Sequence, residues 1–284
     1  MCGIDRTVQR GYCNMPSDLY VARAALHEWE EPIISGTRGS GTIFFSGCSL
    51  GCTFCQNNDI SNGGFGKFIS DERLVEIMLE LQLNGAHNIN FVTPTHYTPT
   101  IRCAIVKARA KGLTIPIVYN TGSYDAVETI KSLSGLVDVY LPDFKYYLSK
   151  TARSLSNAEN YPTVAREAIA EMVSQTGRAE LDVSGMIIRG TIVRILLLPG
   201  HVAEAKLSLK YLFDTYGDDI YISLMSQYTP MKNMLPQLNR TVTRDEYRQL
   251  VEYAESIGVK NAFIQEHDAA NKVFIPKFDG TGVI

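Results

Sequence analysis

Three closely spaced cysteines are the residues in this chain best suited to chemistry. Cys48, Cys52 and Cys55 follow a C-x3-C-x2-C pattern, directly after the apolar run 42–45. Iron–sulfur clusters are held by cysteine thiolates, normally four for a cubane of four irons. Three thiolates on one short loop would leave one iron of such a cubane open to a small molecule. The spacing therefore predicts a reactive iron–sulfur centre.

Two other kinds of site use the same residue type. Cys52 and Cys55 alone form a C-x-x-C pair, as in redox dithiols, but that interpretation leaves Cys48 unexplained. A structural zinc site needs four ligands in a closed tetrahedron, and no fourth cysteine or histidine lies nearby in the sequence. Both remain alternatives to the cluster.

The whole pattern, with Phe54 just before the last cysteine, resembles the signature of the radical S-adenosylmethionine (SAM) superfamily. The resemblance implies two cofactors: a [4Fe-4S] cluster on Cys48, Cys52 and Cys55, and SAM, whose amino and carboxylate groups bind the open iron. It implies that a reduced cluster splits SAM into methionine and a 5′-deoxyadenosyl radical. It also implies a flavodoxin- or ferredoxin-type electron donor.

The length suits one large domain of α/β-barrel type or two small ones, and the composition argues against two classes of partner. The chain has 284 residues, 45% of them hydrophobic, and a net charge of −3. That balance gives no electrostatic footprint for nucleic acid, and no apolar run is long enough to span a membrane. The N-terminus has no apolar signal region. We therefore expect a cytoplasmic protein, in which cysteines stay reduced.

The other three cysteines follow no such pattern. Cys103 lies in a predicted amphipathic helix and is expected in the core. Cys2 and Cys13 are too few to complete a typical cluster, so they are expected to form a labile metal site or to stay unliganded.

Strands and helices are expected to alternate from residue 41 onward, because apolar runs alternate with segments of helical periodicity. The expected strands are 41–46, 88–93, 115–120, 136–141, 191–198, 219–225 and 260–265. This order predicts an α/β fold with a parallel sheet and right-handed crossovers, a radical SAM-type partial (β/α)6 barrel over residues 41–284. Residues 1–40 are expected to be an irregular N-terminal extension, and a long polar loop should follow residue 141.

The ends of the predicted strands supply candidate SAM contacts, because chemistry in barrel sheets gathers at the C-terminal ends of strands. An acid, two cations, hydroxyls and amides there could hold a zwitterionic amino acid with a ribose and an adenine. The candidates are Phe54 in the cysteine loop and Thr93, Thr95, His96, Asn120, Asp143, Lys145, Arg194 and Gln227 at or near strand ends.

Within the superfamily, the chain most resembles the activating enzymes of glycyl-radical enzymes, especially pyruvate formate-lyase activating enzyme and its uncharacterised homologues. The matching segments are 47–56, 120–121, 141–145 and 193–200. The resemblance implies hydrogen abstraction from a glycine of a partner glycyl-radical enzyme. The family has a Gly-Gly-Glu motif that contacts the SAM amino group, where this chain has Thr93-Pro94-Thr95-His96. A different peptide or small-molecule substrate is therefore the alternative, and a non-catalytic metal-binding protein is the competing class.

Asp143 follows an apolar strand, so its carboxylate should be partly buried and needs a partner, either Lys145 or a bound cation. Oxygens of Asn120, Thr121, Leu141 and Asp143 would form the all-oxygen cage that hard cations prefer. The resemblance implies a monovalent cation beside the SAM carboxylate. Because asparagine at position 120 replaces an acid of the family, we predict a weak or empty cation site, with Lys145 close to SAM.

Overall fold

The computed structural model describes residues 3–231, 235–265 and 276–284, and its centre is one curved, mixed sheet. The strand order is β10-β9-β8-β6-β5-β4-β2-β1-β3, and every neighbouring pair from β2 to β10 is parallel. The parallel strands are β2 (Ser40–Phe45), β4 (Ile89–Val92), β5 (Ile117–Thr121), β6 (Val139–Pro142), β8 (Ile187–Leu196), β9 (Tyr221–Met225) and β10 (Ala262–Ile264). All seven coincide with expected strands.

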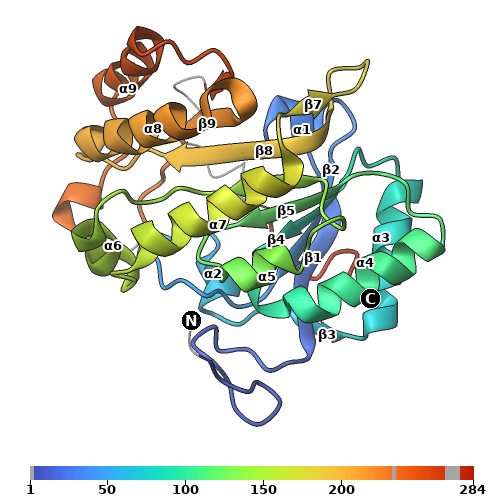
Figure 1. The fold of residues 1–284 in the computed structure, drawn as a ribbon. Helices are drawn as coiled ribbons and strands as arrows, with labels where there is room; N and C mark the ends of the chain where they lie inside the picture. The colour runs from blue at the N-terminus through green and yellow to red at the C-terminus, as the bar shows by residue number, and fades with distance from the viewer. Residues whose placement is uncertain (1–2, 232–234, 266–275) are drawn as a thin grey trace.

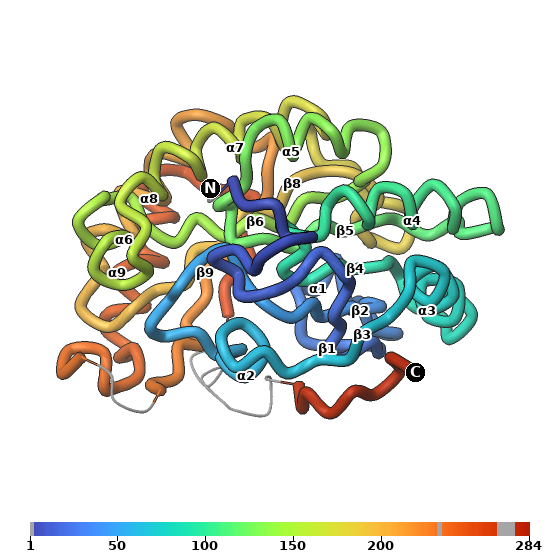
Figure 2. The backbone as a smooth tube through the Cα atoms, turned by 90° about the horizontal axis from the view of Figure 1, so that it is seen from below, coloured from blue at the N-terminus to red at the C-terminus, as the bar shows by residue number. Residues whose placement is uncertain are grey.

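Helices follow these strands and cover the outer side of the curved sheet (Figures 1 and 2). The main helices are α3 (Asp71–Leu83), α4 (Thr98–Ala110), α5 (Val127–Lys131), α7 (Tyr161–Thr176), α8 (Val202–Tyr216) and α9 (Arg244–Ser256). Among the described strands, β10 and β3 end the order without joining, so the barrel is partial. The expected α/β partial barrel is confirmed.

Local signals explain where several elements begin. Ser70 caps α3, because its hydroxyl accepts a hydrogen bond from the Arg73 backbone N–H. The capping box of α9 is complete: Thr243 accepts from the Glu246 N–H, and Glu246 accepts from the Thr243 N–H. All six residues of β2 are buried, as expected of a parallel strand covered on both faces.

The N-terminal forty residues are more regular than expected. Leu19–His27 forms β1, which pairs antiparallel with β2 and with β3 (Lys67–Ile69), and Pro32–Ser35 forms the short helix α1. The sequence of β1 does not alternate strictly between apolar and polar residues, so the period-2 signal of a strand is weak. The prediction of an irregular extension was wrong for these residues.

Other short elements lie between the main ones. The expected polar loop after β6 contains the helix α6 (Ser149–Ser156), which the sequence analysis did not predict. The helix α2 (Asn58–Ser61) follows the cysteine loop, and β7 (Glu180–Leu181) forms a hairpin with the start of β8.

The cysteines outside the C-x3-C-x2-C pattern differ in their exposure. Cys103 is exposed on α4, so the prediction of a core position was wrong. Cys13 is a buried free cysteine, and Cys2 lies outside the described residues. No helix in the described ranges is long and apolar enough to cross a membrane.

We predict that Glu246→Gln destabilises the protein by about 1.5–3 kcal/mol at pH 7, the range for hydrogen bonds to a charged group. The Glu246 carboxylate accepts hydrogen bonds from Arg240 and from the backbone N–H of Thr243 and Gly200. These partners, Arg240 foremost, lower the pKa of Glu246 from 4.5 to about 2. A lowered pKa stabilises the fold above pH 4.5, and this stabilisation disappears as the pH falls towards 2.

The measurement is urea denaturation of both proteins at pH 7, 4 and 3. The difference in the free energy of unfolding between wild type and Glu246→Gln should decrease steadily as the pH falls. Glu252→Gln is the matched control, because Glu252 lies on the same helix with 63% of its side chain exposed. A penalty independent of pH would contradict the assignment.

Candidate functional site

The cysteine loop follows β2 and is fixed by backbone contacts to distant segments. The Thr53 N–H donates a hydrogen bond of 2.9 Å to the Leu155 carbonyl on α6. At the start of the loop, Gly47 has a φ of +83°, and a Cβ there would lie 2.7 Å from the Cys13 carbonyl oxygen and 2.3 Å from the Met15 side chain. Only glycine fits this position without a shift of its neighbours.

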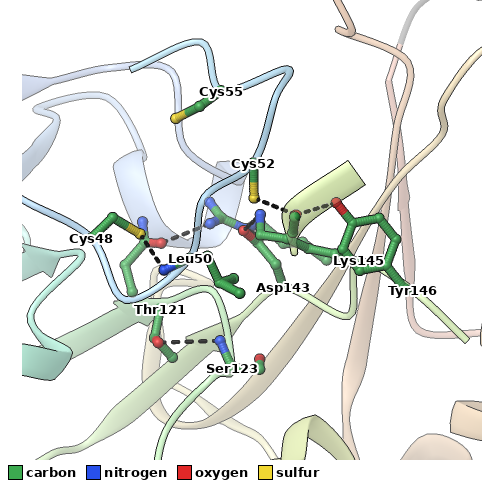
Figure 3. Close-up of polar contacts among 12 residues, drawn as sticks. Cys48, Leu50, Cys52, Cys55, Thr121, Ser123, Asp143, Lys145 and Tyr146 are labelled. Atoms are coloured by element: carbon green, nitrogen blue, oxygen red, sulfur yellow. Dashed lines mark hydrogen bonds and ion pairs between the residues drawn. The ribbon is translucent and has the colours of Figure 1, made fainter. Parts of the chain in front are cut away.

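Each of the three sulfurs accepts at least one hydrogen bond from the described residues. The donors are the Leu50 N–H to Cys48 Sγ (3.4 Å), the Ser156 hydroxyl to Cys52 Sγ (3.0 Å) and the Ser61 hydroxyl to Cys55 Sγ (3.3 Å). Figure 3 shows the loop with its three cysteines beside Asp143 and Lys145. Hydrogen bonds to sulfur stabilise thiolates and tune the potential of a bound cluster.

Burial keeps at least two of these thiols protonated in the metal-free protein. Burial, with smaller contributions from Cys52 and Cys55, raises the pKa of Cys48 to about 12, and burial also raises the pKa of Cys55. A metal ligand must be a thiolate, so binding of a cluster would release protons.

The donor set fits a cluster better than a single ion. In the described ranges, no three His, Cys, Asp or Glu side chains are grouped closely enough to hold one metal ion. A structural zinc ion binds its thiolate sulfurs at about 2.3 Å and needs four ligands around one point. In a cubane each thiolate binds a different iron, so the sulfurs need not meet at one point. The arrangement therefore favours the cluster over the zinc alternative.

A cavity of about 510 Å³ opens beside the cysteine loop, inside the curve of the sheet. Cys52 and Cys55 line one side of it. Six of the predicted contact residues also line it: Phe54, Asn120, Asp143, Lys145, Arg194 and Gln227. They come from the cysteine loop and from the ends or flanks of β5, β6, β8 and β9, so the sheet brings together residues that are far apart in sequence.

A buried ion network crosses the cavity wall. Arg194 Nε lies 2.7 Å from Asp143 Oδ1, and Lys145 Nζ lies 2.6 Å from Asp143 Oδ2. Burial alone would raise the pKa of Asp143, but Arg194 and Lys145 hold it below its usual range. Burial would likewise lower the pKa of Lys145, and the Asp143 carboxylate instead holds it above its usual range. All three groups are therefore charged at neutral pH.

Side-chain oxygens of three of the four residues predicted to form a cation cage already have partners in the protein. Both Asp143 oxygens accept from protein cations, and Asn120 Oδ1 accepts from Arg194 Nη2 at 2.7 Å. The Thr121 hydroxyl donates to Asp125 at 2.6 Å. Lys145 is thus a partner of Asp143, as the sequence suggested. The crowding of these oxygens agrees with a weak monovalent cation site, which stays a prediction.

Three predicted contacts do not line this cavity: Thr93, Thr95 and His96. Burial lowers the pKa of His96 to about 4, so the ring is neutral, and its Nε2 lies 2.8 Å from the Ser46 carbonyl oxygen. Thr95 lies 3.3 Å from the Thr121 hydroxyl. Thr93 has a φ of +58°, a conformation that glycine adopts freely and that costs a threonine about 1–3 kcal/mol. Directly after β4, the backbone thus adopts a conformation typical of glycine, although the residue there is Thr93.

Several lining residues were not predicted from the sequence. Glu30 and Glu31 reach the cavity from the segment between β1 and α1, and Gln265 reaches it from the end of β10. Gln56, directly after Cys55, donates to the Gln227 carbonyl at 2.9 Å. The sequence signal for these two glutamates is the acidic segment 28–31, which lies within the expected irregular extension.

Comparison with known proteins identifies one family, one relative in sequence and several solved structures with the same fold. The profile of the Radical SAM superfamily matches residues 42–212. A relative from Methanocaldococcus jannaschii, described as the uncharacterized protein MJ0674, is 28% identical over 264 residues, which cover 89% of this chain and 72% of the relative.

Three solved structures share the fold at low identity. SuiB of Streptococcus suis, bound to S-adenosylmethionine, aligns with a TM-score of 0.54 at 12% identity over 77% of this chain and 48% of SuiB. Methylornithine synthase (PylB) aligns with a TM-score of 0.54 at 14% identity, over 78% of this chain and 64% of PylB. HydG, a maturase of the [FeFe]-hydrogenase, aligns with a TM-score of 0.53 at 15% identity, over 78% of this chain and 50% of HydG. The chain spans about half the length of SuiB and HydG.

We predict that Asp143→Asn lowers the free energy of unfolding by about 3–5 kcal/mol, because it leaves two buried cations without their shared carboxylate. Asp214→Asn is the control: its pair with Lys210 is exposed, at 54% and 56% of the two side chains, and should contribute little to stability because solvent screens it. Urea denaturation at pH 7 measures both. Equal losses in the two variants would show that the network does not stabilise the fold.

Proposed function

The chain belongs to the Radical SAM superfamily, and we propose that it binds a [4Fe-4S] cluster through Cys48, Cys52 and Cys55 and cleaves SAM reductively. The observation that carries the proposal is the position of the cysteine loop, which lies at the wall of a cavity at the C-terminal ends of parallel strands. In barrel folds, this is the end of the sheet that holds the active site.

The cavity wall suits the two charged ends of an amino acid. Lys145 Nζ has three N–H donors, and among the described residues one of them is used, in its hydrogen bond to Asp143. The remaining donors are available for the SAM carboxylate. The Asn120 and Gln227 side chains line the same cavity and offer amide groups for the ammonium, ribose or adenine. Phe54 is buried beside them and offers an apolar surface.

A bound cluster would supply one electron to SAM, which breaks a carbon–sulfur bond and yields methionine and a 5′-deoxyadenosyl radical. The electron would come from a flavodoxin- or ferredoxin-type donor. A reducing compartment such as the cytoplasm suits a protein whose cysteines must stay available as ligands.

For the substrate, we propose a glycine Cα–H of a partner glycyl-radical enzyme. The support is the sequence similarity of segments 141–145 and 193–200 to the activating enzymes of that class. The radical would take the hydrogen atom to form 5′-deoxyadenosine and leave the partner with a glycyl radical. A different peptide or a small molecule is the alternative, favoured by the exchange of the Gly-Gly-Glu motif for residues 93–96.

We expect that replacing Cys48, Cys52 or Cys55 by alanine abolishes SAM cleavage, because each removes one thiolate ligand. The measurement is 5′-deoxyadenosine released after anaerobic reconstitution with iron and sulfide and addition of SAM and dithionite. Cys103→Ala, an exposed position on α4, is the control and should retain wild-type yield. Full cleavage by Cys52→Ala, or uptake of zinc with SAM left intact, would refute the assignment.

The glycyl-radical proposal predicts a radical on the partner. The reconstituted protein, SAM and reductant are incubated anaerobically with a glycyl-radical enzyme encoded by the same organism. The electron paramagnetic resonance spectrum should show a doublet, because the remaining α-hydrogen splits the signal. The partner with its radical glycine changed to alanine is the control. Formation of 5′-deoxyadenosine without a radical in such partners would favour the peptide or small-molecule alternative.

A further inference from the structure

The segment between β1 and α1 places two neighbouring carboxylates, Glu30 and Glu31, inside the curve of the sheet. Both carboxylate oxygens of Glu30 have partners there. Its Oε1 accepts from Asn90 Nδ2 at 3.1 Å and from Asn120 Nδ2 at 3.2 Å, and its Oε2 lies 3.3 Å from Arg194 Nη1. Glu30 therefore completes the ion network of Asp143 and Arg194.

Glu31 is different, because one of its oxygens has no partner. Only 7% of the residue is exposed, it lines the cavity, and its Oε2 makes no hydrogen bond in the described part of the chain. Ser223 and the Glu31 backbone N–H support the other side of the carboxylate. Glu31 stands at the N-cap position of α1, yet its side chain does not cap the helix. A buried polar atom without a partner is costly and calls for an explanation.

The charges around the cavity do not balance. Among its described lining residues, the carboxylates are Glu30, Glu31 and Asp143, and the cations are Lys145 and Arg194. His27 also lines the cavity, but burial lowers its pKa to about 4, so it is neutral at pH 7. Three acids thus face two cations; Lys145 pairs with Asp143, and Arg194 pairs with Asp143 and Glu30. Burial raises the pKa of Glu31; the nearby Arg194 opposes this, and the charge of Glu30 adds to it, so that the pKa stays raised. A bound cation would relieve this cost.

Glu31 also lies deeper in the barrel than the cysteine loop. Its contact Ser223 sits in the middle of β9, paired with Arg194 and Phe263 of the neighbouring strands. The cysteines and the predicted SAM contacts Lys145 and Gln227 instead follow the C-terminal ends of their strands. Glu31 therefore lies at the level of the Asp143–Arg194 pair, on the deeper side of Lys145 and Gln227.

We propose that Glu31 binds a primary ammonium group of the substrate through its unpartnered oxygen. A primary ammonium is favoured over a guanidinium, because a guanidinium pairs best with two free oxygens of one carboxylate, and here only one is free. A single metal ion is not favoured, because no suitable ligand group surrounds it in the described ranges. This inference rests on the proposed radical SAM function, and adds one feature to its substrate, whether partner protein, peptide or small molecule: a primary ammonium group close to the bond that is attacked.

The test is calorimetric binding of small probes to the reconstituted protein with SAM bound. The probes are n-butylammonium, n-butylguanidinium and the neutral n-pentanol. We expect n-butylammonium to bind most tightly, and Glu31→Gln to weaken it about ten- to hundredfold, as for the loss of a hydrogen bond to a charged group. Binding of n-pentanol should be unchanged. Glu76→Gln, on the exposed face of α3, is the matched control and should bind all three as wild type does.

Thermal unfolding of the protein without probes supplies a second readout. The melting temperature of Glu31→Gln should be no lower than that of wild type, because Oε2 lacks a hydrogen-bond partner until an amine binds and the glutamine oxygen can keep the contacts with Ser223 and the backbone N–H. A clear decrease would show that Oε2 is already paired in the fold and would overturn the proposal. A weaker affinity for SAM in Glu31→Gln would overturn it too, by assigning Glu31 to SAM.

The two proposals fail in different ways. Release of 5′-deoxyadenosine together with equal binding of charged and neutral probes would refute the amine site and leave the radical SAM function standing. Selective binding of n-butylammonium through Glu31 without SAM cleavage would refute the reaction and leave the amine site standing.

Discussion

The site depends on one interaction, the buried pairing of Asp143 with Arg194 and Lys145. Charged groups are stable away from water only when they are paired and hydrogen-bonded. Asp143 directly follows β6, Arg194 lies on β8, and their backbones are also joined, since the Phe144 N–H donates to the Arg194 carbonyl at 2.8 Å. The register of these two strands therefore sets the pairing, and Glu30 extends it to the segment after β1.

The cysteine loop is held by a different part of the fold. Helix α6 supplies both the Leu155 carbonyl that anchors the Thr53 backbone and the Ser156 hydroxyl that donates to Cys52. Tyr146 in turn contacts the Ser156 hydroxyl at 2.5 Å (Figure 3). The loop that would carry the cluster is thus positioned by hydrogen bonds from a helix about a hundred residues away, and the cavity lies between this loop and the ion network.

The two ends of the cavity have different chemistry. Near the strand ends, thiols, a lysine and amides face a space suited to a cluster and SAM. Deeper in the barrel, Asn90 and Asn120 hold Glu30, and Glu31 keeps one carboxylate oxygen without a partner. A reactive radical must be formed next to the bond that it attacks. A substrate between the strand ends and Glu31 would lie next to the SAM from which the radical is formed. The charge imbalance at the deeper end gives that substrate a preferred charge.

The sequence predicts the features that depend on neighbouring residues: the cysteine spacing, the caps at Ser70 and Thr243, and the succession of strands along the chain. These signals are local, because periodicity and capping act within a few turns. It also placed Asn120, Asp143, Lys145, Arg194 and Gln227 at one end of the sheet. Only the tertiary structure decided which of these side chains meet. Glu30 pairs with a residue 164 positions away, Ser156 with one 104 positions away, and His96 turns towards Ser46, because long-range packing selects such contacts and no local pattern encodes them.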